Sequence, residues 1–236
     1  MRLRTRIIKM KVVISHLQAE YISRFDFPDT VFVFDSPTPE DLAEVGDRPF
    51  ITMAKAGNRS ANRNAGLAYW LDRASGDSII EFFDGDRFPV RYSDPAAEME
   101  ASGADILLYP CENDIRLAYA KPGSHLYMKG PGNPFFSCGF AIRRNAIDRI
   151  VAFNHGEFFC EAFSGWGGED QYMGTVAAHL GLKCVLSSHT LLNGSVGGDE
   201  GTHPDYIHAM TTYIQLVLKN GMRSTLMDNV GPLPPR

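Results

Sequence analysis

The chain has 236 residues, of which 44% are hydrophobic and 22% are charged, and its formal net charge at pH 7 is -5. This length suffices for one domain with a full hydrophobic core, and the composition excludes a disordered or a membrane-embedded chain. The negative charge disfavours a broad nucleic-acid surface, which is normally basic, although a local basic patch stays open.

The start of the chain carries no secretory signal, and no apolar run reaches the length that a bilayer requires. We therefore expect a cytoplasmic protein without a membrane span. The cysteines, Cys111, Cys138, Cys160 and Cys184, are far apart and lack the Cys-x-x-Cys spacing of a zinc site, so we expect no structural zinc. In a cytoplasm we expect their thiols to be reduced.

Short β-branched and aromatic runs alternate with helical patterns in the first half of the chain. Strands are predicted at 11–15, 30–35, 49–53, 78–83 and 105–109. Helices are predicted at 58–74 and 96–101, and the helix between the first two strands is short or missing. Alternation of this kind predicts an α/β protein with a mostly parallel sheet.

The second half begins with a long polar stretch rich in glycine and proline, residues 111–134, where we expect substrate contacts. Helical spacing then resumes, and one further strand is predicted. These helices cover 141–153, 169–180 and 206–219, the strand covers 183–186, and a glycine-rich loop covers 193–201.

The apolar run at residues 79–83 leads into two aspartates one residue apart, Asp84 and Asp86. Residues two apart in a strand point to the same face, so both carboxylates should converge. Mg²⁺ and Mn²⁺ prefer oxygen ligands and retain waters, so two carboxylates and the phosphates of a substrate suffice to hold one ion. Taken alone, however, Asp-Gly-Asp is more often a solvated turn.

A second acidic pair, Glu169 and Asp170, follows the glycine-rich turn Gly165-Trp166-Gly167-Gly168. We expect this pair to begin a helix, where the positive end of the helix dipole favours ionised carboxylates. The alternative reading of the pair is N-terminal capping, which is compatible with catalysis. The turn by itself could equally be a packed corner, with Trp166 in it as an apolar platform for a sugar.

Four motifs occur in the order and spacing of nucleotide-sugar glycosyltransferases of the A fold. They are Asn62-Arg63-Asn64-Ala65-Gly66, Gly76-Asp77, Asp84-Gly85-Asp86 with Pro89, and the segment from Gly165 to Asp170. Over residues 11–205 the chain resembles inverting family 2 type enzymes, and its acceptor motif resembles that of β-galactosyltransferases, polypeptide N-acetylgalactosaminyltransferases and chondroitin-type polymerases.

The resemblance implies a GT-A fold, which is a Rossmann-like α/β fold with a mixed, mostly parallel sheet flanked by helices. It implies one domain over residues 1–236, with a donor-binding half at 11–110 and an acceptor-binding half at 111–205. The C-terminal helix and tail, 206–236, would follow.

For the donor, the resemblance implies a nucleotide-diphosphate sugar, by family default a UDP-sugar, with Mn²⁺ or Mg²⁺. Asp86 would ligate the metal directly, and Asp84 would orient the ribose or reach the metal through water. Asp35, Arg63 and Asp77 would lie around the nucleotide.

Members of the family often complete the metal shell with a downstream histidine. His203 and His189 are the two candidates in this chain, and His203 is preferred because it follows a glycine-rich loop. A lone histidine is more often an ordinary hydrogen-bonding residue than a ligand.

For the acceptor, a carbohydrate or another hydroxyl compound, the resemblance implies that Asp170 is the general base of an inverting transfer. Glu169 would hydrogen-bond sugar hydroxyls, and Trp166, Gly167 and Gly168 would contact the substrate.

Three other functions stay open. A nucleotidyltransferase would share the sheet and the acidic pair but has no need for residues 165–170. A non-catalytic sugar- or nucleotide-binding relative would need no metal. A glycosyltransferase that acts on modified nucleic-acid bases is disfavoured by the acidic net charge.

Overall fold

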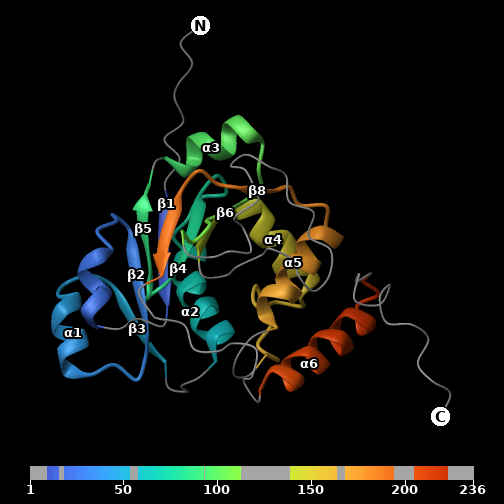
Figure 1. Cartoon of the computed structure of the whole chain (residues 1–236), viewed down its shortest axis with the longest axis horizontal. Helices are drawn as coiled ribbons and strands as arrows, with labels where there is room; N and C mark the ends of the chain where they lie inside the picture. The colour runs from blue at the N-terminus through green and yellow to red at the C-terminus, as the bar shows by residue number, and fades with distance from the viewer. Residues whose placement is uncertain are drawn as a thin grey trace, which may run out of the picture.

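A computed structural model of the chain describes residues 10–15, 19–53, 58–92, 94–112, 139–163, 168–193 and 205–222. Its centre is a seven-stranded sheet with helices packed on both faces (Figure 1). The strand order is β3-β2-β1-β4-β7-β6-β8. The strands are β1 (Met10–Ser15), β2 (Thr30–Asp35), β3 (Phe50–Met53), β4 (Ile79–Asp84), β6 (Ile106–Leu108), β7 (Gly139–Arg143) and β8 (Cys184–Leu186).

Most neighbouring strands in this sheet run parallel, and β7 is antiparallel to both of its neighbours, β4 and β6. A second, antiparallel sheet pairs β5 (Arg87–Arg91) with β9 (Thr190–Asn193). The predicted α/β architecture, a mixed and mostly parallel sheet flanked by helices, is confirmed. The helices are η1 (Ala19–Arg24), α1 (Pro39–Val45), α2 (Arg59–Leu71), α3 (Pro95–Ser102), α4 (Arg144–Phe153), α5 (Glu169–His179) and α6 (Asp205–Lys219).

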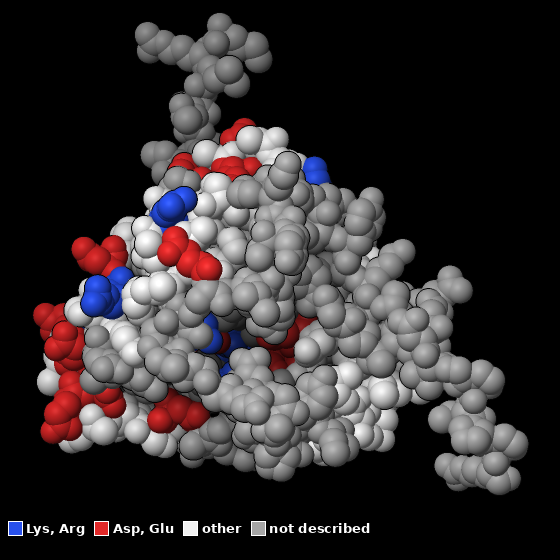
Figure 2. Space-filling model, viewed as in Figure 1, with Lys and Arg blue, Asp and Glu red and all other residues white. Residues whose placement is uncertain are grey.

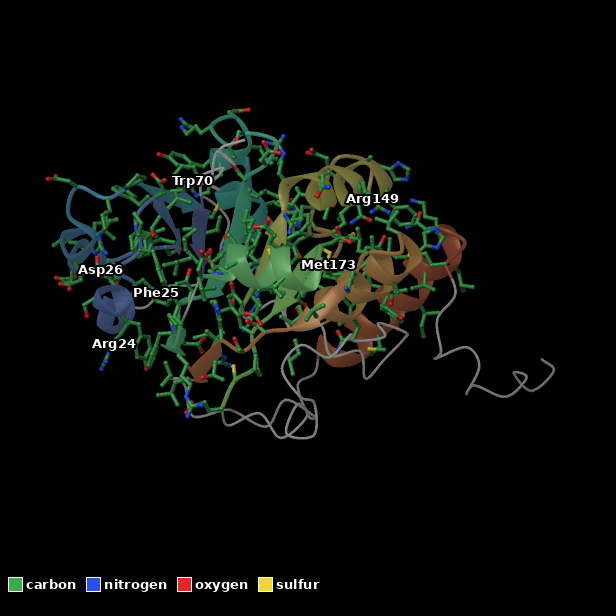
Figure 3. The ribbon with its side chains drawn as sticks, turned by 90° about the horizontal axis from the view of Figure 1, so that it is seen from above. Arg24, Phe25, Asp26, Trp70, Arg149 and Met173 are labelled. Carbon is green, nitrogen blue, oxygen red and sulfur yellow. The ribbon has the colours of Figure 1, made fainter. Side chains whose placement is uncertain are left out.

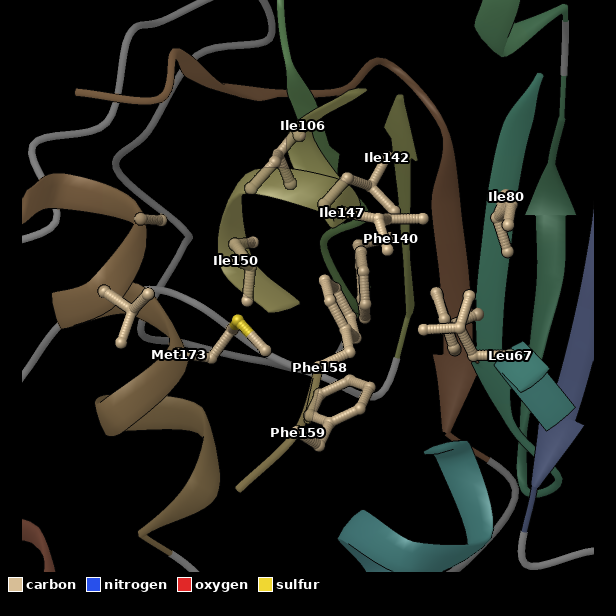
Figure 4. Packing of buried hydrophobic residues seen from close by; sticks show 14 of the residues in the cluster. Leu67, Ile80, Ile106, Phe140, Ile142, Ile147, Ile150, Phe158, Phe159 and Met173 are labelled. Atoms are coloured by element: carbon tan, nitrogen blue, oxygen red, sulfur yellow. The ribbon is translucent and has the colours of Figure 1, made fainter. Parts of the chain in front are cut away.

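One face of the sheet packs against α2, α4 and α5, with α6 beyond them, and forms the larger hydrophobic core. Figure 4 shows part of this core, with Leu67 of α2 on the side of Ile80, Ile147 of α4 near Phe140, and Met173 of α5 near Phe158. Each such fully buried side chain contributes about 1.5–3 kcal/mol through removal of apolar surface from water. This core fixes where α2 and α5 lie relative to the end of β4.

The opposite face packs against η1, α1 and α3 and forms the second core, which includes Ile22, Val45 and Met99. Phe88 of β5 and Leu191 of β9 pack against the same core, so the small sheet covers part of this face. Strand residues alternate between the two faces, as their period of two requires. In β4, Ile80 and Phe82 belong to the first core, and Ile79 and Phe83 belong to the second.

Helix α2 lies unusually close to the sheet at Gly66. A β-carbon at this position would lie 2.4 Å from Cγ1 of Val13 and 2.9 Å from Cγ2 of Val33. One turn further along, the Trp70 indole Nε1 donates a hydrogen bond of 3.0 Å to the Val12 carbonyl oxygen. Figure 3 shows Trp70 between Arg24 on one side of the view and Arg149 on the other. The glycine therefore lets α2 pack directly onto β1 and β2.

Two parts of the sequence-based assignment are wrong. The pattern predicts a helix from residue 141, but residues 139–143 form the buried strand β7 and the helix begins at Arg144. A strand that is covered on both faces is apolar throughout, so it lacks the alternation that separates strand from helix. The small sheet of β5 and β9 and helix α1 were not predicted, although Thr38 and Asp41 form a capping box at α1.

In the described residues, no helix is both long and apolar enough to cross a membrane. Three of the cysteines, Cys111, Cys160 and Cys184, have free thiols. Cys138 lies outside the described residues.

Candidate active site

Two of the predicted acidic residues lie at the same edge of the sheet. Asp35 ends β2 and Asp84 ends β4, and both strands run parallel to β1, which lies between them. The carboxyl ends of parallel strands meet at one edge, which is where open α/β sheets bind ligands. Residue Ser36, directly after Asp35, has a φ of 60°, so the chain turns sharply as it leaves this edge.

Asp84 points to the face of the sheet that α2 covers, because it has the same parity in β4 as Ile80 and Phe82. There Nη2 of Arg63 donates to Oδ1 of Asp84 over 2.8 Å. Arg63 belongs to α2, three residues before Gly66. The close approach of α2 at Gly66 thus brings Arg63 to the end of β4.

Arg63 also reaches the second acidic motif. Its Nη1 lies 3.4 Å from Oε1 of Glu169, the first residue of α5, and its guanidinium lies over the Phe159 ring at 5.3 Å from the ring centroid. The Arg63 side chain is buried. Burial alone lowers the pKa of the guanidinium, but the negative charges of Asp84, Glu169 and Asp170 outweigh it and raise the pKa. Arg63 therefore stays charged between the two motifs.

The first turn of α5 places Glu169 and Asp170 differently. Glu169 is buried, and Asp170 is partly exposed. The helix begins after Gly168, whose φ is 89°, and a β-carbon there would lie 2.7 Å from Cε1 of Phe163. The Gln171 side chain accepts a hydrogen bond from the Gly168 backbone N–H. A glycine at 168 is thus required by both the backbone and the packing.

Asn64 ties α2 to the segment that leads toward α5. Its side chain accepts a hydrogen bond from the Phe159 N–H at 2.9 Å and donates to the Phe159 carbonyl at 2.8 Å. It also donates to Oε1 of Glu161 at 2.9 Å. Arg63 therefore contacts both acidic motifs, and the adjacent Asn64 fixes the segment before α5 at Phe159. Sequence reasoning assigned no role to Asn64, although it belongs to the motif that carries the resemblance.

Asp86 does not share a strand face with Asp84, contrary to the prediction. Asp84 is the last residue of β4, and Asp86 lies in the turn before β5. Oδ2 of Asp86 is 2.8 Å from Nη1 of Arg87, and the Asp86 side chain is 25% exposed. The turn breaks the strand period, so the pleat does not direct the two carboxylates to one face.

The donor set at this turn suits a hard divalent cation. Both candidate ligands are carboxylates, and oxygen atoms are the ligands that Mg²⁺ and Mn²⁺ prefer. Asp86 is accessible, and two carboxylates suffice when phosphate oxygens and waters supply the remaining ligands. Among the described residues, no group of three or more His, Cys, Asp or Glu side chains forms a metal site by itself.

One of the two candidate histidines, His189, is among the described residues, and it lies away from this turn. His189 is buried, and its ring stacks on Tyr109 and lies near Glu98 of α3. These neighbours are on the face of the sheet opposite to Arg63, so His189 is not placed to complete a metal shell with Asp84. His203 lies outside the described residues.

The remaining candidates are distributed as follows. Asp77 precedes β4, at the opposite end of the strand from Asp84, so the structure does not bring it to the site. Trp166 and Gly167 lie outside the described residues, as does nearly all of the stretch 111–134 in which we expected substrate contacts. The structure thus brings together Asp84, Glu169 and Asp170 around Arg63, with Asp35 at the same edge of the sheet.

Figure 2 shows a hollow near the middle of one face of the molecule, in which basic and acidic side chains lie next to one another. In the same view of the ribbon, this region corresponds to α2 and the beginning of α5 (Figure 1). Side chains of both charges are therefore visible in a recess of this face.

Comparison with solved structures identifies the fold. TarS 1–349 from S. aureus in complex with UDP is 17% identical to the chain, with a TM-score of 0.63, and the match covers 94% of this chain and 69% of that one. GalNAc-T7 with UDP, GalNAc and Mn²⁺ is 13% identical, with a TM-score of 0.58 over 91% of this chain and 48% of that one.

The chain is shorter than these proteins. It spans 40% of S. aureus TarS, to which it is 17% identical with a TM-score of 0.59 over 89% of its own length. At these identities the comparisons establish a shared GT-A-like fold. No protein-family model matches the chain, and no curated protein matches it in sequence.

Proposed function

We propose that this chain is a metal-dependent glycosyltransferase that moves a sugar from a nucleotide-diphosphate sugar to a hydroxyl acceptor. The observation that carries the proposal is the buried Arg63, which contacts Asp84 of the proposed donor site and Glu169 of the proposed acceptor site. Arg63 thus joins two acidic motifs that are 85 residues apart in sequence, which supports the placement of both motifs at one reaction centre.

The donor would bind at the carboxyl edge of the sheet. Asp35, at the end of β2, would contact the nucleotide, and Asp84 and Asp86 would hold Mn²⁺ or Mg²⁺ at the diphosphate. When bound, the cation stabilises the negative charge of the departing nucleotide diphosphate. We take a UDP-sugar as the donor, and the UDP bound to TarS 1–349 and GalNAc-T7, which share this fold, supports that choice.

The acceptor would bind at the beginning of α5. The acceptor oxygen attacks the anomeric carbon, the bond from this carbon to the phosphate oxygen breaks, and the acceptor proton passes to a carboxylate oxygen of Asp170. The nucleotide diphosphate leaves with the electron pair of the broken bond. Attack from the side opposite to the leaving group inverts the anomeric configuration.

The exposure of the two carboxylates fits this division of roles. Asp170 is partly exposed and could meet a substrate hydroxyl, while the more deeply buried Glu169 is held by Arg63. Glu169 would orient Asp170 and the sugar hydroxyls. Trp166, Gly167 and Gly168 would form the sugar-binding part of the same turn, and His203 would be a further metal ligand.

The test is isothermal titration calorimetry of the chain with UDP, in the presence of Mn²⁺ and in its absence. We expect binding that requires the metal and is weakened by Asp86→Ala by at least about tenfold, since this variant removes a direct charged ligand. GDP, TDP and CDP serve as controls for the base. Release of UDP from UDP-GlcNAc then reports turnover of the donor.

Binding of UDP that is equally strong without metal and in Asp86→Ala would contradict the proposed metal site. If several UDP-sugars bind but none of them releases UDP, the result would instead favour a non-catalytic relative.

A further inference from the structure

A carboxyl group lies buried in β4 on the face opposite to Asp84. Glu81 interrupts an otherwise apolar strand, and its side chain is fully buried. The Tyr92 hydroxyl donates to its Oε2 over 2.6 Å, and the Tyr109 hydroxyl donates to its Oε1. Neither partner is a cation, so these contacts stabilise the carboxylate through hydrogen bonds and not through an ion pair.

The bond to Tyr92 closes the base of the turn that carries Asp84 and Asp86. Glu81 lies on β4, which enters the turn, and Tyr92 directly follows β5, which leaves it. These two arms belong to different sheets, because β5 pairs with β9. The side-chain bond between Tyr92 and Glu81 thus links two arms that share no backbone ladder.

Tyr109 holds Glu81 from a different element. It follows β6, and its ring stacks on Phe83 at 5.7 Å and on His189 at 5.2 Å between centroids. It therefore contacts the same carboxylate as Tyr92 but is not part of the arms of the turn. The two tyrosines form a natural pair for comparison.

We propose that Glu81 is a positioning residue for the turn that carries Asp84 and Asp86, because its carboxylate holds the Tyr92 end of the outgoing arm against the incoming strand. The identity of the ligand at this turn, UDP with a divalent cation, rests on the proposed function. The link itself is a property of the free protein.

The link should depend on the protonation of Glu81. Burial raises the pKa of Glu81 to about 7, since it outweighs the two tyrosine hydrogen bonds, which lower the pKa, and the charge of Asp94 raises it further. An ionised carboxylate accepts from both hydroxyls. A protonated one donates through its own O–H, so that one tyrosine must turn to accept. Above pH 7 the link to Tyr92 is therefore charge-assisted and stronger.

Three other titratable side chains near Glu81, those of His189, Tyr92 and Tyr109, also have shifted pKa values. Burial lowers the pKa of His189 below its usual value, despite the nearby Glu98 and Asp94, and burial next to Glu81 raises the pKa of both tyrosines. The groups that face Glu81 or its tyrosine partners are Tyr92, Tyr109, Asp94, Glu98 and His189. A transition near neutral pH that Glu81→Gln removes would therefore report Glu81.

The experiment compares Tyr92→Phe with Tyr109→Phe, each of which removes one hydroxyl from the same carboxylate. We expect Tyr92→Phe to weaken UDP binding in the presence of Mn²⁺ by about tenfold, a usual size for coupling between sites, and Tyr109→Phe to weaken it much less. The wild-type Kd should fall as the pH rises from about 6 to about 8, and Glu81→Gln should remove this dependence.

Hydrogen exchange of the free protein tests the link without any ligand. Backbone amides of residues 85–91 should exchange faster in Tyr92→Phe than in Tyr109→Phe, and circular dichroism should show that both variants are folded. Equal exchange and equal Kd in the two variants would overturn the proposal. If the wild type binds no UDP, the proposed function fails, and the exchange comparison alone decides the role of Glu81.

Discussion

Nη2 of Arg63 donates to Oδ1 of Asp84 over 2.8 Å, and both side chains are shielded from solvent, with exposures of 1% and 13%. A buried guanidinium is stable only when carboxylates compensate its charge. The position of the Asp84 carboxylate therefore depends on Arg63, and through it on how α2 packs on the sheet.

Arg63→Met should destabilise the protein by about 3–5 kcal/mol, because it leaves Asp84 and Glu169 buried without their cation. Arg63→Lys should recover part of the loss, since it keeps the charge but not the fork that reaches both carboxylates. Urea unfolding measures both changes. Asp148→Ala, which breaks the exposed pair with Arg144, is the control and should cost at most about 0.5 kcal/mol. Equal effects of Arg63→Met and Asp148→Ala would contradict the structural role of Arg63.

Gly66→Ala should destabilise the protein by about 1–3 kcal/mol through overpacking, because the new methyl group would overlap Val13 and Val33. Gly76→Ala is the matched control, since a β-carbon at Gly76 meets no atom within 4 Å. The midpoint of thermal unfolding should fall clearly for the first variant and change little for the second. Similar midpoints would show that α2 can move away from the sheet without cost.

The stability of the wild type should fall between pH 4.5 and about 7 relative to Glu81→Gln, because the pKa of Glu81 rises from 4.5 to about 7 on folding. The folded state binds this proton more tightly than the unfolded state, so the contribution is complete below pH 4.5 and is lost as the pH rises through 7. The two pKa values correspond to about 3 kcal/mol at 1.36 kcal/mol per pKa unit. Urea unfolding of both proteins over this range measures the difference, and parallel profiles would exclude a raised pKa.

Asp170→Asn should leave the Kd for UDP with Mn²⁺ within about twofold of wild type and slow sugar transfer by about 10²- to 10⁴-fold, the usual contribution of a general base. Calorimetry measures the first quantity, and release of UDP in the presence of acceptor measures the second. A loss of UDP binding in this variant would contradict the assignment of Asp170 to the acceptor. A product with retained anomeric configuration would contradict the inverting mechanism.

The sequence was sufficient for features that depend on local pattern. The buried strands β1, β2 and β4 are marked by β-branched and aromatic runs, and the start of α5 is marked by glycines followed by acidic residues. The fold class was also predictable, because strands and helices alternate along the chain and this alternation is typical of an α/β sheet.

Only the tertiary structure decided which of the acidic residues meet. Asp77 and Asp84 are close in sequence but lie at opposite ends of β4, whereas Asp84 and Glu169 are far apart in sequence and contact the same guanidinium. His189 was a candidate ligand by position in the chain, but it packs against Tyr109 and Glu98 on the other face of the sheet. Contacts between distant segments follow from how helices pack on the sheet, and a local pattern carries no information about that packing.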